Sequence, residues 1–486
     1  MIGAIRYFGC ARAIRFHAGF SFNEGYRLNK PHPNGSQHRA LTEGSVSHHL
    51  FRLTGFMLLG FVSVMGANLM ESLYISQVGT LELAALGFTF PLVMMMQGVT
   101  MGLGVGASSV VARKIGAHAW PEARVLISHA IWMVIVFTMA LSLLVYWGVG
   151  SIFALLGADP AAEALASEYM ALWLFGLPFF AVAMVGSSLM RAAGDATKPS
   201  YLMTVSALIQ IGLGPLLIFG FGSFEGLGMP GAAWSFLVAR FVSFLMYFYY
   251  MRRDGLLVPG LAGFGDSSRS ILHVGLPAIA ANLISPVSMT VITRLLASHG
   301  TAVVAGFSVA SRVETMFAMF MWALSMSIAP IIGQNWGAGH FDRVRTALRS
   351  AYVFALVWGL FSFLVLFTAG PWLLHWVNDD PEVIAAATTY LSILPLGMGL
   401  MGVIATSTSS FNALGKPSPP LAISIVQMLV LSVPLAIVGN ELFGYTGLLF
   451  GSVLSIGLTA ILSYVWLRRT IKRRLSVGER DAAPVV

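Results

Sequence analysis

Two carboxylates lie inside long apolar stretches of this chain, where an ionised group is hard to accommodate. Of the twenty Asp and Glu residues, only Glu71 and Glu314 fall well within such stretches. A charge in the hydrocarbon region of a membrane is costly and persists mainly where it has a function. A carboxylate in a partly dry cavity can load and release a proton, or pair with Na⁺ or an organic cation. The two acids are therefore the first candidates for an exchange site.

Each acid also has a structural interpretation. Glu71 lies in the outer half of its apolar stretch, from which a long side chain can reach the membrane surface. Glu314 has Arg312 two residues before it, and Arg294 lies in the preceding stretch. Because residues two apart on a helix do not face each other, Arg294 is the better ion-pair partner of the two. For Glu314 the sequence leaves a transport role and a structural ion pair open.

Three arginines, Arg240, Arg294 and Arg312, also fall within apolar stretches. One interpretation is that they are ion-pair partners of Glu71 and Glu314, since buried charges are usually paired. The other is a cavity lined by arginine, which would attract anions through bidentate contacts to phosphate.

The apolar stretches hold no converging nucleophile, base and metal ligands of the kind an enzyme needs. The eleven His residues fall in loops or near the ends of these stretches, and the single cysteine is Cys10. We therefore expect neither catalytic residues nor a metal site, and no cofactor other than a coupling ion. A transporter is favoured over an enzyme.

The composition places the chain in a membrane. Hydrophobic residues make up 57% and charged residues 10%, and the mean hydropathy is +0.80, far above soluble proteins. Stretches of about twenty apolar residues, the length that spans a bilayer as a helix, recur twelve times. They lie near 51–75, 83–111, 125–147, 169–190, 201–221, 232–251, 271–296, 303–332, 348–374, 384–411, 421–438 and 444–467. The prediction is an all-α integral membrane protein with twelve transmembrane helices.

Charges in the loops predict the orientation of the twelve helices. Loops rich in Lys and Arg alternate with loops that carry only acids, and excess Lys and Arg marks the cytoplasmic side. Both termini are therefore expected in the cytoplasm of a multi-pass protein of the plasma (inner) membrane. The net charge of +8 is explained by this topology, so no nucleic-acid partner is needed. The basic loops contain Arg113, Lys114, Arg191, Lys198, Arg252, Arg253, Arg343, Arg345, Lys416 and Arg468.

The chain repeats itself at about half its length. The segment 112–118 is echoed by 333–339, and 189–199 recurs from 410 to 417, both with a shift of 221 residues (337 − 116 and 415 − 194). Such duplication in a membrane protein is typical of transporters whose pathway lies between the halves. With six helices each, the halves enter the membrane in the same orientation. We therefore predict two six-helix lobes related by a pseudo-two-fold axis along the membrane normal.

These features divide the chain into five parts. Residues 1–48 are predicted to form a basic cytoplasmic arm, disordered or partly an extension ahead of the true start. Residues 49–253 form the amino-terminal lobe with helices one to six, and 254–270 a cytoplasmic linker. Residues 271–469 form the carboxyl-terminal lobe, and 470–486 a cytoplasmic tail.

Several short motifs, each weak alone, occur together in the order and spacing of one family. With them the chain resembles the multidrug and toxic compound extrusion (MATE) family, in its prokaryotic form, over about residues 50–469. The resemblance implies efflux of small organic, cationic or amphipathic, substrates in exchange for H⁺ or Na⁺. It further suggests alternating access by a monomer in the lipid bilayer. The motifs are Glu71–Gly79 followed by Leu83–Gly87, Arg191–Pro199, Gly214–Gly220, Leu227–Ala233 and Pro330–Gly339.

The resemblance also assigns the coupling site. It places a coupling acid at Glu71, where family members usually carry Asp. One prokaryotic branch has Asn and Asp four residues apart in the fifth helix, and here those positions are Gln210 and Gly214. Gln210 keeps an amide that can hydrogen-bond a carboxylate, whereas Gly214 removes the second acid. Asn68, three residues before Glu71 on the same helix face, could add an oxygen ligand or simply pack between helices.

Two alternative functions remain open, and one of them is a membrane channel. The three intramembrane arginines would suit a flippase for lipid-linked oligosaccharides, a class that shares the wider superfamily architecture. Such flippases often have fourteen helices, so the expected twelve and the family motifs favour the efflux transporter.

Overall fold

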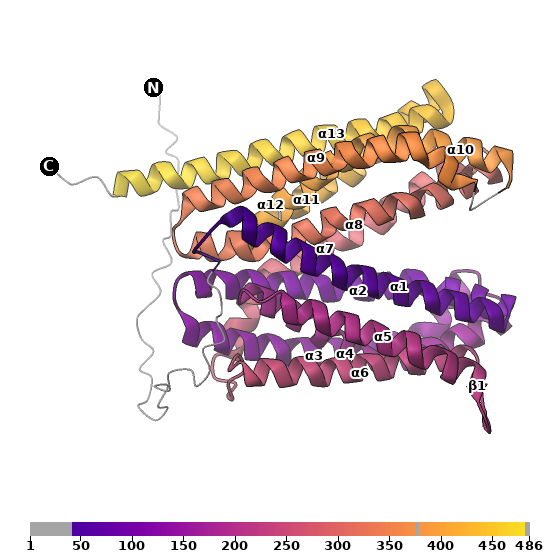
Figure 1. Ribbon diagram of the computed structural model, residues 1–486, viewed down its shortest axis with the longest axis horizontal. Coiled ribbons are helices and arrows are strands. Elements are labelled where there is room, and N and C mark those ends of the chain that lie inside the picture. The colour runs from indigo at the N-terminus through magenta and orange to yellow at the C-terminus, as the bar shows by residue number, and fades with distance from the viewer. Residues whose placement is uncertain (1–40, 376–378, 482–486) are drawn as a thin grey trace, which may run out of the picture. The chain divides into compact units, whose positions relative to one another are not determined.

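The computed structural model describes residues 41–375 and 379–481 (Figure 1). This part of the chain is almost entirely helical. One two-stranded antiparallel hairpin, β1 with β2, interrupts the helices. The elements are α1 (Val46–Val78), α2 (Thr80–Gly116), α3 (Trp120–Leu155), α4 (Pro160–Ala192), α5 (Thr197–Phe219), β1 (Gly220–Phe221), β2 (Phe224–Glu225), α6 (Met229–Arg253), α7 (Phe264–Ala297), α8 (Thr301–Gly337), α9 (Phe341–Leu374), α10 (Pro381–Ile393), η1 (Leu394–Gly397), α11 (Met398–Ala413), α12 (Ser418–Ile425), η2 (Val426–Ser432) and α13 (Val433–Asp481).

The described residues contain twelve membrane crossings, as predicted. Ten helical segments are long and apolar enough to span a membrane. One of them, Ser418–Arg473, crosses twice because the chain turns back at Gly444, whose φ is +63°. The turn brings Gly439 against the Gly447 carbonyl and Gly451 against the Leu435 carbonyl. The remaining crossing is α7. The twelve-helix fold is confirmed.

The internal repeat is visible in the helix bounds. Helix α2 becomes α8, and α4 becomes the continuous run α10–η1–α11, when both bounds are shifted by 221 residues. The local signals repeat as well. Asp159 caps α4 by accepting two backbone N–H groups, and Asp380 caps α10 by accepting that of Glu382. Each helix begins with a proline. The duplication predicted from the sequence is thus a duplication of structure.

The two halves meet around a pseudo-two-fold axis that passes between Ala112 of α2 and Gly333 of α8. These residues are 221 apart in the sequence, and a Cβ on Gly333 would lie 2.7 Å from the Ala112 Cβ. On either side, a Cβ on Gly116 would overlap the Gln334 carbonyl oxygen, and one on Gly337 would overlap the Arg113 carbonyl oxygen. Small residues therefore let α2 and α8 cross at close backbone contact.

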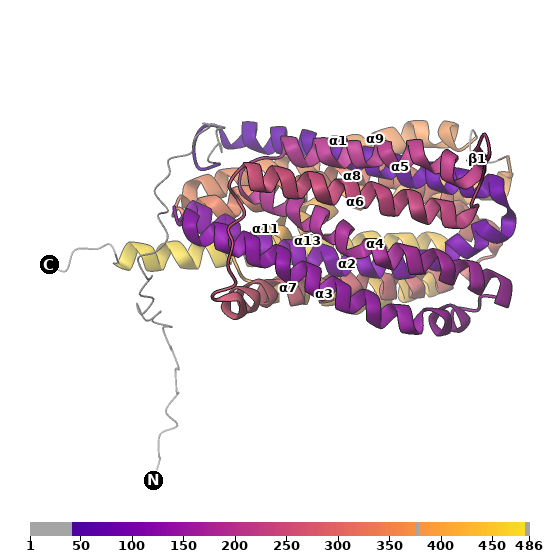
Figure 2. The same cartoon turned by 90° about the horizontal axis from the view of Figure 1, so that it is seen from below.

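Two helices exchange packing partners between the halves. At one end of α1, Leu50 and Leu53 are buried in a cluster formed mainly by α8, α9 and α11. Reciprocally, Ile271 and Ile279 of α7 are buried in the cluster formed by α2, α3 and α4. The lobes are therefore interlocked through α1 and α7. The view in Figure 2 shows how these helices lie among the others.

We name the two ends of the bundle by their charges. The basic end carries Arg113, Lys198, Arg252, Arg343 and Lys416, and the acidic end carries Glu82, Asp159, Glu225, Asp380 and Glu441.

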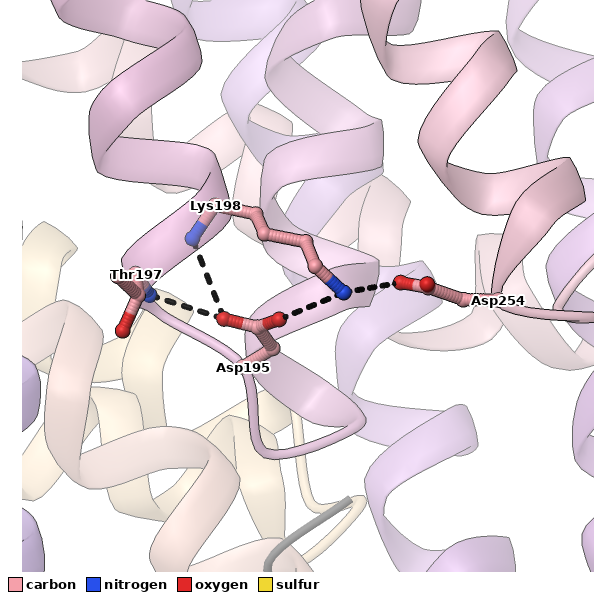
Figure 3. Close-up of polar contacts among 4 residues, drawn as sticks. All are labelled: Asp195, Thr197, Lys198 and Asp254. Carbon is pink, nitrogen blue, oxygen red and sulfur yellow. Dashed lines mark hydrogen bonds and ion pairs between the residues drawn. The ribbon is translucent and has the colours of Figure 1, made fainter. Parts of the chain in front are cut away.

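At the basic end, an ionic cluster fixes the turn between α4 and α5 (Figure 3). Asp195 Oδ1 accepts the backbone N–H groups of Thr197 at 3.0 Å and Lys198 at 3.2 Å, which caps α5. The ammonium group of Lys198 lies 3.2 Å from Asp195 Oδ2 and 2.5 Å from Asp254 Oδ2, just past α6. The cluster thereby ties the beginning of α5 to the end of α6.

Several predicted boundaries differ from the structure. Residues 1–40 lie outside the described chain, but the predicted disorder is wrong for residues 41–48. Leu41 is 2% exposed, and α1 begins at Val46. The predicted linker 254–270 ends earlier, since α7 begins at Phe264, and the predicted tail from 470 continues α13 to Asp481. Hydropathy does not locate the starts of α1 and α7 or the end of α13, because these helical ends are polar.

Candidate functional site

Glu71 lies near the acidic end of α1 and accepts hydrogen bonds on both carboxylate oxygens. Tyr169 of α4 donates its hydroxyl to Oε1 at 2.7 Å. Gln210 of α5 donates its amide nitrogen to Oε2 at 3.0 Å. Three helices of one lobe thus converge on a single carboxylate, and both partners are buried, Tyr169 to 4% and Gln210 to 3% exposure.

Arg240 of α6 lies behind Gln210. Its Nη2 donates to Gln210 Oε1 at 3.1 Å, and its Nη1 donates to Ser206 Oγ at 3.1 Å. The guanidinium also packs over the rings of Phe236 and Phe180, with its central carbon 4.9 and 5.5 Å from the ring centroids. Such cation–π contacts stabilise a cation away from water. No salt bridge within 4.0 Å joins Arg240 to Glu71 in the described chain. The Gln210 side chain instead lies between the two charges and is hydrogen-bonded to both.

A small cavity, with no room for a water molecule, adjoins this network. Beside it, the ring of Tyr74 leaves little room for a second acid at Gly214. A Cβ there would lie 3.0 Å from the ring of Tyr74, whose hydroxyl donates to the Ile211 carbonyl at 3.3 Å. The Tyr74 ring therefore occupies the space that a second carboxylate would need. The cavity is lined by Ala67, Glu71, Tyr74, Gln210, Ile211, Gly214, Ile218 and Ser235.

Asn68 does not join the site. Its side chain is exposed, and only its backbone carbonyl makes a described contact, accepting the Ser72 hydroxyl at 3.1 Å. Asn68 and Glu71 were expected to lie on the same face of the helix and to act together. They make no described contact, because the Glu71 side chain extends toward α4 and α5. The predicted oxygen ligand is therefore absent from this arrangement.

Glu314 has an analogous partner in the other lobe. Tyr390 of α10 donates its hydroxyl to Glu314 Oε2, and the Tyr390 ring packs edge-on against Phe307 at 5.0 Å. The described residues show no ion pair between Glu314 and either Arg294 or Arg312, and both arginines are exposed. The described contact of this carboxylate is thus a hydrogen bond from a tyrosine, and the ion-pair interpretation finds no support in the described chain.

Sequence reasoning missed both tyrosines, although the repeat could have found them. Tyr169 and Tyr390 are 221 residues apart, at the same position of the duplicated helix. Each donates to a carboxylate. The carboxylates themselves are not equivalent, since Glu71 lies on α1 and Glu314 on α8. A search for polar residues at the repeat spacing would have singled out the pair.

The described residues hold no group of three or more His, Cys, Asp or Glu side chains close enough to bind a metal ion. The Glu71 carboxylate meets a hydroxyl and an amide group, and the Glu314 carboxylate meets a hydroxyl.

Comparison with known proteins shows the family to which this chain belongs. The family model described as MatE matches residues 57–216 and 277–438, once in each half of the chain. The chain is also 32% identical over 417 residues to an FAD transporter of Shewanella oneidensis, an alignment covering 85% of this chain and 92% of the relative. The chain belongs to the MATE family. It is a multi-pass membrane transporter of small organic molecules and not an enzyme, as the sequence predicted.

Other members are more distant and agree in fold. A probable multidrug resistance protein, NorM of Thermotoga maritima, is 24% identical, over 85% of this chain and 93% of its own. The crystal structure of the Vibrio cholerae MATE transporter VcmN in its bent form superposes with a TM-score of 0.84. It is 29% identical and covers 88% of this chain and 97% of its own. The two-lobed, twelve-helix architecture is that of this family.

Proposed function

We propose that this MATE protein is an antiporter that exports organic compounds in exchange for H⁺ or Na⁺, with Glu71 as the coupling carboxylate. The observation that carries the proposal is the convergence of the buried Tyr169 and Gln210 side chains on Glu71, within the first membrane helix. Both partners hold the carboxylate in place whether it is ionised or has bound its ion. Binding of the coupling ion to Glu71 then changes the charge of the lobe. This change in charge shifts the balance between the two conformations and thereby alters the affinity for the cargo.

Alternating access would use the two lobes as its moving parts. The charge pattern supports a cytoplasmic location for the basic end. Contacts between α2 and α8 bring the lobes together there, so the conformation is closed at the basic end. Export requires these contacts to open, load cargo and close again. We further propose a monomer in the plasma membrane with both termini in the cytoplasm.

Glu314 is the second candidate for a coupling group. It is an acid within a membrane helix, held by a tyrosine at the repeat position of Tyr169. Its described partner is the uncharged Tyr390 hydroxyl, and no ion pair of Glu314 occurs among the described residues. Each lobe would then contribute one chargeable group to the transport cycle.

The cargo class has two candidates. The family resemblance favours cationic or amphipathic compounds. A negatively charged dinucleotide is favoured by the relative named as an FAD transporter and by two exposed arginines, Arg294 on α7 and Arg312 on α8. An exposed arginine within a membrane helix is costly unless it faces water or an anion, and phosphate is a preferred partner of its guanidinium.

The test is transport by the purified full chain in proteoliposomes. Vesicles loaded with FAD or with a fluorescent lipophilic cation receive a pH gradient or a Na⁺ gradient, applied separately. We expect uphill export that collapses with the gradient, and Glu71→Gln should abolish it while leaving the protein folded. Export by Glu71→Gln at the wild-type rate would refute the role of this residue. Arg312→Met should reduce export of FAD more than that of the cation, and equal effects would remove the dinucleotide candidate.

A further inference from the structure

The orientation of the Gln210 amide is fixed by chemistry, because an arginine side chain has only donors. Arg240 Nη2 lies 3.1 Å from the Gln210 side chain, so the atom facing it must be the carbonyl oxygen. The amide nitrogen is then forced toward Glu71, which it meets at 3.0 Å. Arg240 itself has little freedom, since Ser206 and the rings of Phe180 and Phe236 hold its guanidinium.

This orientation determines what Glu71 can bind. The carboxylate meets a hydroxyl donor on one oxygen and an N–H donor on the other. Hard metal cations are bound by several oxygen atoms at once. Among the described contacts of Glu71 the only side-chain amide is that of Gln210, and its oxygen is turned away and accepts from Arg240. A proton, by contrast, needs no shell of oxygen ligands.

The charged and titratable groups around Glu71 are few. Tyr169 approaches from α4 and Arg240 from α6, behind the uncharged Gln210 of α5. Tyr74, on α1 itself, lines the adjoining cavity. Arg240 is the one positive charge among them. It is 7% exposed, and its Nε has no hydrogen-bond partner in the described structure. Burying a cation carries a desolvation cost in free energy. We therefore expect Arg240 to have a role at the site.

We propose that Arg240 is a positioning residue that sets the ion selectivity of Glu71. By holding the Gln210 carbonyl oxygen, it presents an N–H donor to the carboxylate and withholds the oxygen ligand that Na⁺ would need. The site therefore exchanges H⁺ and rejects Na⁺. This inference rests on the proposed coupling role of Glu71. It adds a residue that touches neither the coupling ion nor the cargo and acts through Gln210.

The experiment compares wild type, Arg240→Met and Arg240→Lys in proteoliposomes, with pH and Na⁺ gradients applied separately and over a range of pH. We expect wild-type export to follow the pH gradient and to ignore Na⁺. In Arg240→Met the amide can turn its oxygen to Glu71. Proton-driven export should then fall about tenfold, the worth of one charged hydrogen bond, and Na⁺ should begin to compete. Arg240→Lys keeps the charge and one donor, so it should recover much of the wild-type pH profile.

Arg253→Met, on the same helix but exposed at the basic end, is the matched control and should behave as wild type. If Arg240→Met does not accumulate in the membrane, the inference is tested by the Na⁺ response of the wild type and by the pH profile of Arg240→Lys. Wild-type export driven by Na⁺, or Arg240→Met with an unchanged pH profile and no response to Na⁺, would overturn the inference. Failure of Glu71→Gln to abolish export would instead overturn the proposed function, so the two are separable.

Discussion

Arg113 and Gln334 occupy equivalent positions of the two repeats and make the same contact in opposite directions. Arg113 Nη1 donates to the Ala413 carbonyl at 3.0 Å, and Gln334 Nε2 donates to the Ala192 carbonyl at 2.7 Å. Both acceptors end a helix, and they too are 221 residues apart. Each lobe therefore satisfies an unpaired carbonyl at the end of a helix of the other lobe. The closed basic end is built from two copies of one interaction.

We expect Gly337→Ala to weaken closure of the basic end, because its Cβ would overlap the Arg113 carbonyl oxygen. Overlap of this kind typically costs about 1–3 kcal/mol, which corresponds to about a 5- to 150-fold shift in population. With Cys10 replaced by Ser, a single cysteine at Ala413→Cys, buried between the lobes, reports the change. Labelling by a membrane-impermeant maleimide in inside-out vesicles should rise. Gly148→Ala in α3, which meets open space, should not alter labelling, and an unaltered rate in Gly337→Ala would contradict the crossing as the gate.

Tyr169→Phe should slow gradient-driven export without abolishing it. The variant removes the hydrogen bond to Glu71 Oε1 but leaves the ring packing and the bond from Gln210. Loss of one hydrogen bond to a charged group corresponds to about tenfold. Tyr146→Phe, an exposed tyrosine of α3, is the matched control. Equal export rates for Tyr169→Phe and the control would show that the hydroxyl does not hold Glu71 during transport.

Glu314→Gln separates a coupling role from a structural one. Tyr390 can donate to an amide oxygen as well as to a carboxylate, so we expect the fold to persist and export to fall. A structural ion pair with Arg294 predicts a different result, in which Glu314→Gln lowers thermal stability and Arg294→Gln restores it. Glu225→Gln, an exposed acid of β2, controls for the loss of charge. Wild-type export by Glu314→Gln would leave Glu71 as the sole coupling acid of the two.

Arg343→Met should destabilise the protein, since this arginine holds the segment before α1. Its guanidinium donates to Asn335 Oδ1 at 2.8 Å and to the carbonyls of Leu41, Glu43 and Gly44 at 2.8 to 3.2 Å. We expect the thermal midpoint in detergent to fall by about 2–4 °C. Arg345→Met removes only an exposed pair with Asp342, which is worth little. Equal midpoints for the two variants would show that the segment is not held by Arg343.

The sequence predicted the fold because its signals are local and strong. Twelve apolar stretches and the 221-residue shift were sufficient for the lobes, and the helix bounds of α2 and α8 repeat at that shift. The predicted boundaries at 48, 270 and 470 do not coincide with helix ends, which lie at Val46, Phe264 and Asp481, since polar helical turns such as the start of α7 carry no hydropathy signal.

The site was predicted in part. Glu71 and Gln210 meet as the resemblance suggested, and Glu314 is held within its lobe. Asn68 is not in contact, and Arg294 and Arg312 make no ion pair with Glu314 in the described chain. The helix periodicity shows which residues share a face but not which way a long side chain turns.

Hydropathy, loop charge and duplication are properties of the chain taken segment by segment. The sequence by itself therefore determined twelve helices in two lobes and an acid within the first helix. The partners of that acid depend on how each helix is rotated and where it crosses its neighbours. The rotation and crossing angle of each helix depend on close packing at small residues such as Gly116, Gly333 and Gly337. This packing involves two helices at once, so the sequence of one segment does not specify it. Only the tertiary structure therefore decided that Tyr169, Gln210 and Arg240 form one chain of hydrogen bonds ending on Glu71.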